Sequence, residues 1–174
     1  NVIACSTCPA GTYGNVVAAP NMTHGCPHRC PAGRYGTQHG ATNGMMACPS
    51  PCPAGRFGNV TGGTSENTAC PFVCSPGRFG VFPAQTNTSR CNICAAGSYC
   101  VHGHRQLCPT GRFGNITGQS TEVAACINAC PLGTLGVAEG QTSETSACDD
   151  SCPAGKFANI SRTGTICVSC PAGR

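Results

Sequence analysis

The stretch that decides the fold is residues 52–70, which read CPAGRFGNVTGGTSENTAC. It opens with a cysteine, passes through a Pro-x-Gly turn and an aromatic residue, and runs as a polar loop to a second cysteine. Close variants of C-P-A-G-x-aromatic-G begin at Cys8, Cys30, Cys52, Cys74, Cys94, Cys108, Cys130, Cys152 and Cys170. Self-similarity at a nearly fixed period of this kind is typical of a repeat protein.

Each position of the repeat has a physical task. The proline after the opening cysteine fixes φ and removes a backbone donor, and Pro-x-Gly is turn chemistry. One large side chain follows the turn, and we expect it to pack over a neighbouring disulfide. This position is occupied by Tyr13, Tyr35, Phe57, Phe79, Tyr99, Phe113, Leu135 and Phe157.

Glycine and proline interrupt every 3.6-residue pattern, so the sequence predicts almost no helix. We expect small disulfide-rich repeats that form an elongated rod of stacked short β-ribbon and turn modules. In such an array each unit touches only its neighbours.

The cysteine phrase divides the chain into units. Residues 1–7 are interpreted as the end of a preceding repeat, and residues 170–174 as the start of a further one. Between them the boundaries are 8–29 for repeat 1, 30–51 for repeat 2, 52–73 for repeat 3, 74–93 for repeat 4, 94–107 for a truncated irregular repeat, 108–129 for repeat 5, 130–151 for repeat 6 and 152–169 for repeat 7.

The amino-acid composition indicates the cellular compartment in which the protein functions. The 174 residues include 18 cysteines, only 9% are charged and tryptophan is absent, so a conventional core is not expected. Disulfides persist in secreted and surface proteins, which predicts an extracellular or cell-surface location. The chain has no apolar run long enough for a membrane span. It begins at Asn1 without a signal peptide, and the secretion signal is expected to lie outside this sequence.

Cysteines occur as close pairs separated by long loops. Sequence alone does not fix their connectivity, but one assignment accounts for nearly all of them: the cysteine that opens each unit bonds the one that closes its loop. The expected disulfides are Cys8–Cys26, Cys30–Cys48, Cys52–Cys70, Cys74–Cys91, Cys94–Cys100, Cys108–Cys126, Cys130–Cys148 and Cys152–Cys167. Cys5 and Cys170 remain without partners in this segment and are expected to bond outside it or to link neighbouring subunits.

Two other uses of the cysteines are disfavoured. C-x2-C and C-x3-C are zinc spacings, but the pairs repeat uniformly, whereas the five histidines keep no register. Redox catalysis by C-x2-C lacks its usual βαβ surroundings. We therefore expect no metal, no cofactor and no catalytic residue. The arginines are spaced along the chain without a basic run, which argues against nucleic acid as a partner.

Five N-x-S/T sequons mark the chain for N-glycosylation, at Asn21, Asn59, Asn87, Asn115 and Asn159. Asn59, Asn115 and Asn159 occupy one register, seven residues after the first cysteine of their unit. A shared register favours use of these three sites, because each glycan would lie at the same place on its repeat.

The phrase CPAGRFGNVTGGTSENTAC resembles the ephrin-receptor-like cysteine-rich repeat, and the resemblance covers nearly the whole chain. Long arrays of this type occur in surface glycoproteins and flagellar-hair (mastigoneme-type) glycoproteins of protists and algae. The chain departs from the usual form by its C-x3-C spacing and by the shortened stretch CAAGSYCVHGHRQLC at residues 94–108. That stretch, with His102 and His104, is the one place where a specialised site is expected, although an irregular spacer is the simpler interpretation.

These features favour an extracellular structural glycoprotein, a segment of a glycosylated filament, stalk or surface coat whose partners are copies of itself and covalent glycans. A receptor ectodomain or adhesin that binds a protein or glycan is the alternative. Catalysis requires acid, base or nucleophile groups converging in a pocket, and the six carboxylates mostly lie in loops, so an enzyme is not expected.

Overall fold

The computed structural model describes residues 7–16, 19–161 and 164–171 of the 174-residue chain. The chain divides into two compact units, and each is described by itself. Unit 1 comprises Asn1–Cys74 and Gly80–Cys91, and unit 2 comprises Ser75–Phe79 and Asn92–Arg174. Both are built from the same small module.

Every full module begins with a tight turn. In repeat 1 the amide of Thr12 donates to the carbonyl of Pro9 over 3.1 Å, and Gly11 has φ +76°. A four-residue turn with positive φ at its third position is a type II turn, which requires glycine there. The same hydrogen bond recurs in repeat 3, from Arg56 to Pro53.

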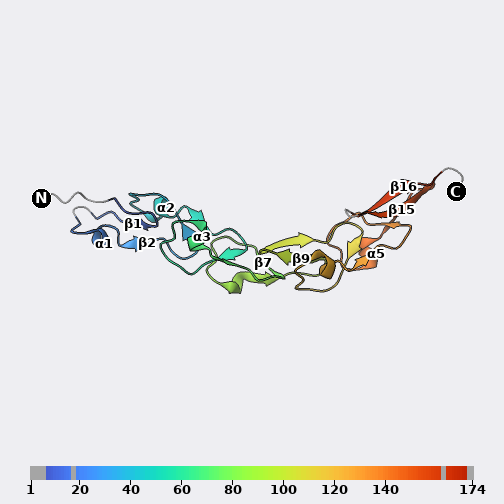
Figure 1. The fold of residues 1–174 in the computed structure, drawn as a ribbon, viewed down its shortest axis with the longest axis horizontal. Helices are drawn as coiled ribbons and strands as arrows, with labels where there is room; N and C mark the ends of the chain where they lie inside the picture. Colours follow the sequence, from blue (N-terminus) through green and yellow to red (C-terminus); the bar gives the residue numbers. More distant parts are fainter. Residues whose placement is uncertain (1–6, 17–18, 162–163, 172–174) are drawn as a thin grey trace. The chain divides into compact units, whose positions relative to one another are not determined.

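The residues after the turn form one strand of a two-stranded antiparallel ribbon. Its partner strand is the short segment between the closing cysteine and the next opening cysteine, so the C-x3-C spacing supplies the second strand. Figure 1 shows β1 and β2 of the first ribbon in blue. In unit 1 the pairs are β1 (Thr12–Tyr13) with β2 (His28–Arg29), β3 (Arg34–Tyr35) with β4 (Ser50–Pro51), and β5 (Arg56–Phe57) with β6 (Phe72–Val73).

The later ribbons follow the same plan with two longer exceptions. β7 (Arg78–Gly80) pairs with β8 (Cys91–Ile93), β11 (Arg112–Phe113) with β12 (Asn128–Ala129), and β13 (Thr134–Leu135) with β14 (Asp150–Ser151). The truncated repeat forms a hairpin of β9 (Ser98–Val101) and β10 (His104–Leu107). Repeat 7 forms the longest hairpin, from β15 (Lys156–Ser161) and β16 (Gly164–Ser169).

Helical turns close most of the loops, and the expectation of almost no helix missed them. Each is one turn long and ends at the closing cysteine. They are α1 (Met22–Gly25), α2 (Gly44–Ala47), α3 (Glu66–Ala69), the 3₁₀ turn η1 (Thr88–Arg90), α4 (Glu122–Ala125) and α5 (Glu144–Ala147).

Side-chain capping explains these turns. An Asn, Ser or Thr precedes each turn and accepts a hydrogen bond from a backbone amide in its first residues, as Asn43 does from Met46 over 3.0 Å. Such caps satisfy donors that a short helix leaves unpaired. At α3 the cap is a capping box, in which Ser65 and Thr68 each bond the other's backbone amide. The caps thus support these helical turns although the sequence has no 3.6-residue apolar pattern.

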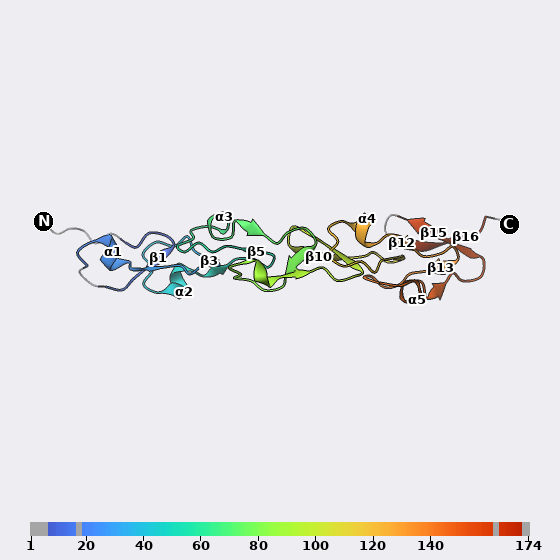
Figure 2. The same cartoon turned by 90° about the horizontal axis from the view of Figure 1, so that it is seen from below.

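The core consists of cystines and buried alanines, with one aromatic ring in each of five clusters; the cystines and rings were expected, and the alanines were not. Tyr13 of repeat 1 packs on the disulfide Cys30–Cys48 of repeat 2, together with the buried Ala47. Tyr35, Phe57, Tyr99 and Phe113 each pack in the same way on the cystine of the following module. The one-turn helix of that module packs there too: α2 contacts β1 in Figures 1 and 2. The prediction that this side chain packs over a neighbouring disulfide is confirmed at five of the eight positions, whereas Phe157 is 44% exposed.

Modules also touch beyond their immediate neighbours, so the nearest-neighbour expectation is wrong. The turn glycine Gly11 of repeat 1 lies against the backbone of Gly62 in repeat 3. Gly33 of repeat 2 lies in the same way against Ala84 of repeat 4. This close approach between the two backbones is possible because glycine has no Cβ atom. A Cβ on Gly33 would lie 2.6 Å from the Ala84 carbonyl oxygen.

Candidate functional site

The three sequons that share a register lie on exposed backbone beside the ribbons. Asn59 and Asn115 are the second residues after β5 and β11, and Asn159 lies within β15. All three are exposed. In the same segments the aromatic residues Phe57 and Phe113 are only 9% exposed. The ribbons of repeats 3 and 5 therefore present an asparagine to solvent while their aromatic residue faces the module interior.

The other two sequons have a second role that the sequence reasoning missed. Asn21 caps α1, and its Oδ1 accepts from the amide of His24 over 3.0 Å. Asn87 caps η1, and its Oδ1 accepts from the amide of Ser89 over 2.9 Å. Both asparagines are exposed. Since an N-glycan bonds the amide nitrogen, the capping oxygen stays available as an acceptor. The signal in the sequence is their position four or five residues before a closing cysteine.

Eight disulfides hold the modules, and their partners are the pairs expected from the sequence. Most of their sulfurs are buried. Cys170 is a free, exposed cysteine, and Cys5 lies outside the described residues. Each loop is thus closed by a cystine that also forms the hydrophobic centre of the module.

An arginine on the first strand supports several of these cystines, and this role was not foreseen. The closing cysteine is the C-cap of its helical turn, so its carbonyl lacks an intrahelical partner. Arg56 donates from Nε and Nη2 to the carbonyl of Cys70 over 3.0 and 2.8 Å, and Arg112 makes the same two bonds to Cys126. Arg34 donates from Nε to Cys48 over 2.9 Å.

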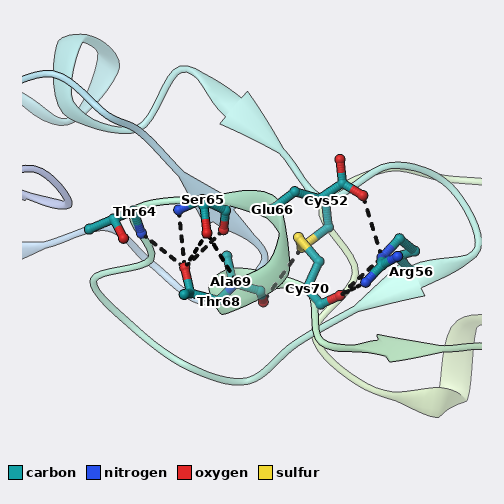
Figure 3. The surroundings of a disulfide bond; sticks show 8 residues. All are labelled: Cys52, Arg56, Thr64, Ser65, Glu66, Thr68, Ala69 and Cys70. Atoms are coloured by element: carbon teal, nitrogen blue, oxygen red, sulfur yellow. Dashed lines mark hydrogen bonds and ion pairs between the residues drawn. A yellow bond between two sulfur atoms is a disulfide. The ribbon is translucent and has the colours of Figure 1, made fainter.

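Figure 3 shows this arrangement around Cys52–Cys70, with Arg56 on one side of the cystine and the Ser65–Thr68 capping box on the other. Arg56 also forms an ion pair with Glu66 over 3.5 Å. The signal in the sequence is the arginine directly before the aromatic residue in C-P-x-G-R-aromatic. Three of the ten Lys and Arg residues, Arg34, Arg56 and Arg112, are therefore not simple solvated charges, because each bonds its own module.

The truncated repeat, where a specialised site was expected, is a hairpin whose turn is occupied by His102 and Gly103. Both have positive φ, 51° and 78°, as a two-residue type I′ turn requires. His102 and His104 are exposed. Among the residues that the structure describes, no group of three or more His, Cys, Asp or Glu side chains is placed to hold a metal ion.

The hairpin is instead organised around a buried serine. Ser98 accepts a hydrogen bond from Nε of Arg105 over 3.0 Å and donates to the carbonyl of Ala95 over 2.7 Å. Ser98 is fully buried beside Cys94. These bonds tie Arg105 of β10 and the carbonyl of Ala95 to Ser98 of β9.

Unit 1 carries a shallow groove of about 540 Å³ between repeats 1 and 2. Its walls are mostly apolar and include Tyr13, Pro31, Arg34 and Met45. Met45 is 88% exposed in α2, although methionine is a residue that usually packs inside. The groove is a candidate binding surface on unit 1.

No helix among the described residues is both long and apolar enough to cross a membrane. Comparison with known proteins found no family model that matches the sequence and no curated protein that matches it.

Proposed function

We propose that the chain is a segment of an extracellular structural glycoprotein, a non-catalytic array of ephrin-receptor-like repeats in a filament, stalk or surface coat. Disulfide-rich modules of this kind belong to secreted proteins, where they serve structural or binding roles. The finer assignment rests on repetition: one cystine-centred module recurs along the chain with little variation.

The observation that carries the proposal is the register of the exposed sequons. Asn59 and Asn115 occupy the same exposed position beside equivalent ribbons, and Asn159 occupies the corresponding position in repeat 7. A glycan at each would coat the array at regular intervals while the aromatic side of each module stays packed. A periodic coat suits a structural surface protein better than a receptor with one specific site.

The test uses antibodies raised against the 174-residue chain on intact, unpermeabilised cells of the source organism, followed by electron microscopy. The proposal predicts repeated labelling along an external filament or coat, and a loss of mass from the purified protein when N-glycans are released enzymatically. Labelling confined to the cell interior, or a protein without glycans, would contradict it.

The groove between repeats 1 and 2 supports the alternative, a receptor or adhesin. An exposed methionine and an aromatic ring next to an arginine are features of binding surfaces. A glycan or protein array probed with the purified chain separates the two functions. A saturable ligand that is lost in Met45→Ser, but kept in the matched Val123→Ser variant of exposed helix α4, favours the adhesin.

A further inference from the structure

Repeat 4 differs from other modules at the residue directly before its closing cysteine. In repeats 2, 3, 5 and 6 this residue is a fully buried alanine at the end of a one-turn α-helix, namely Ala47, Ala69, Ala125 and Ala147. In repeat 4 it is the exposed Arg90, at the end of the 3₁₀ turn η1. The cysteines of this module are 17 residues apart in sequence, against 18 in repeat 3. The interior of repeat 4 therefore lacks the methyl group that these modules bury beside their cystine.

The side chain of Gln85 is buried in this module instead. Gln85 forms a backbone bridge with Phe57, as Gly63 does with Tyr35, so Gln85 and Gly63 occupy equivalent positions. A Cβ on Gly63 would lie 2.5 Å from the Cβ of Ala69, which shows that the alanine fills the space next to this position in repeat 3. Without the alanine, repeat 4 has room for a longer side chain there, and Gln85 is only 4% exposed.

This burial leaves the amide of Gln85 without a hydrogen-bond partner. Among the described residues, none bonds its Nε2 or its Oε1. Gln141, at the equivalent position of repeat 6, is less buried, and its Nε2 donates to the carbonyl of Glu139 over 3.2 Å. Burying an unpaired amide costs free energy, and native proteins pair nearly all such groups. The orphaned amide of Gln85 therefore suggests a partner that is not part of the polypeptide.

Gln85 lines a pocket of about 390 Å³ whose walls are mostly polar and belong to unit 1. The other walls include Phe82, Thr86, Asn87 and Arg90. The ring of Phe82 is 61% exposed and adds an apolar surface to these polar groups. The volume lies in the range of small-molecule sites, about 300 to 1,000 Å³, which combine aromatic surface with a few polar groups that orient the ligand.

Asn87 both lines this pocket and begins the sequon Asn87-Thr88-Ser89. Its Oδ1 accepts hydrogen bonds from the amide and the hydroxyl of Ser89, so this oxygen is engaged in the cap of η1. Its Nδ2 donates to Oγ1 of Thr86 over 3.5 Å, and Thr86 is another lining residue. Nδ2 is the atom that carries an N-glycan, so the first sugar of a glycan on Asn87 would be bonded at the pocket itself.

We infer that the first N-acetylglucosamine of a glycan on Asn87 docks in this pocket and completes the packing of repeat 4. One face of the sugar ring packs on Phe82, because its C–H hydrogens are attracted to the negative face of an aromatic ring. The side chain of Gln85 turns toward the pocket and pairs with the acetamido group, since each of these amides has a donor and an acceptor. The inference rests on the proposed glycoprotein and gives one of its glycans a structural role.

Site-by-site release of the glycans tests this inference, with the 174-residue chain secreted from a eukaryotic host. A peptide N-glycosidase cleaves the bond between Nδ2 and the sugar, and mass spectrometry of peptides follows the reaction at each asparagine. In the native protein we expect release at Asn87 to be about tenfold slower than at Asn21 and Asn59, because the docked sugar must first leave the pocket. Asn21 is the matched control, since it caps α1 through the same kind of bond but does not line this pocket. After reduction and denaturation the three rates are expected to be equal.

Variants of the pocket identify the groups that hold the sugar. Phe82→Ser is expected to raise the rate at Asn87 to that at Asn21, whereas Val81→Ser, at a 49% exposed residue that does not line the pocket, leaves it slow. Gln85→Met keeps the size of the side chain and removes the amide, so release at Asn87 is expected to become several-fold faster. The same substitution is expected to cost no stability in a chain with Asn87→Asp, which keeps the capping oxygen but carries no glycan.

Three results overturn the inference. They are equal rates at Asn87 and Asn21 in the native protein, an Asn87 without glycan in a chain that is glycosylated elsewhere, and slow release that survives either Phe82→Ser or Gln85→Met. Each of them leaves the glycosylated array of the proposed function standing. A chain that carries no glycan at any asparagine contradicts both proposals, so the two failures are distinguishable.

Discussion

Single side chains decide how well each module closes, and the arginine before the aromatic residue is the clearest case. Its guanidinium bonds the carbonyl of the closing cysteine, which caps the helical turn and has no partner within it. The sequence shows this arginine in several modules but does not show its partner, because the two are 14 residues apart and are brought together by the cystine.

Replacing Arg112 by glutamine removes both bonds to Cys126. We expect a loss of about 1.5 to 3 kcal/mol in the free energy of unfolding, since a hydrogen bond that involves a charged group is worth about that much. Guanidinium denaturation with disulfides intact measures it. Arg90→Gln, at an exposed residue of η1, is the control and is expected to change stability by less than about 0.5 kcal/mol.

A second prediction compares the effect on stability of the same substitution at two turn glycines, Gly33 and Gly133. Gly33→Asn places a Cβ 2.6 Å from a backbone oxygen, whereas Gly133→Asn meets open space at a similar positive φ. We expect a cost of more than about 2 kcal/mol at Gly33 and less than about 1 kcal/mol at Gly133. Thermal unfolding at a concentration where the chain is monomeric measures both. Equal costs would mean that backbone strain, not packing between modules, selects glycine.

At the scale of elements, the sequence predicted the ribbons and the turns and missed the helical turns. Pro-x-Gly and the spacing of cysteines are local signals, so the type II turn and its short strand follow from them. The one-turn helices carry no apolar periodicity, and their signal is a capping Asn, Ser or Thr before the closing cysteine. At Asn21 and Asn87 the capping role is also harder to recognise in the sequence, because the same asparagine belongs to an N-glycosylation sequon.

Asn21 offers a way to separate its two roles. Asn21→Ala removes both the cap of α1 and the glycosylation site, while Thr23→Ala removes only the site. We expect Asn21→Ala to unfold with a free energy about 1 kcal/mol lower than Thr23→Ala, because that is the usual worth of a side-chain cap. Denaturation of the two variants measures the difference, and mass spectrometry confirms that both lack the glycan. Equal stability would show that the cap contributes nothing.

Because the cystines close loops of two sizes, we expect them to contribute different amounts to the free energy of unfolding. Cys52→Ala with Cys70→Ala opens a loop with a sequence separation of 18 residues, and Cys94→Ala with Cys100→Ala opens one with a separation of 6. Chain entropy alone predicts losses of about 3 and about 2 kcal/mol. The first pair is also the buried centre of its module, so its measured loss is expected to exceed the entropic value. A larger loss from the short loop would contradict this account.

At the scale of the whole molecule, the repeat order and the pairing of cysteines could be anticipated, while the contacts between modules could not. The regular alternation of opening and closing cysteines in the sequence is enough to define each repeat. The contact of Gly11 with repeat 3, or of Gly33 with repeat 4, joins residues about two repeats apart and depends on how modules stack. The sequence shows an unbroken set of turn glycines but does not show that some are covered and others open.

The central claim is that each module is closed by its own cystine and packs on the next. Disulfide mapping of the mature protein, by mass spectrometry of peptides cut under non-reducing conditions, tests it most directly. The account predicts eight cross-links that each join an opening cysteine to the cysteine closing the same loop, such as Cys30–Cys48 and Cys108–Cys126. Cross-links within the close pairs, such as Cys26 to Cys30, or thiols in place of cystines, would contradict it.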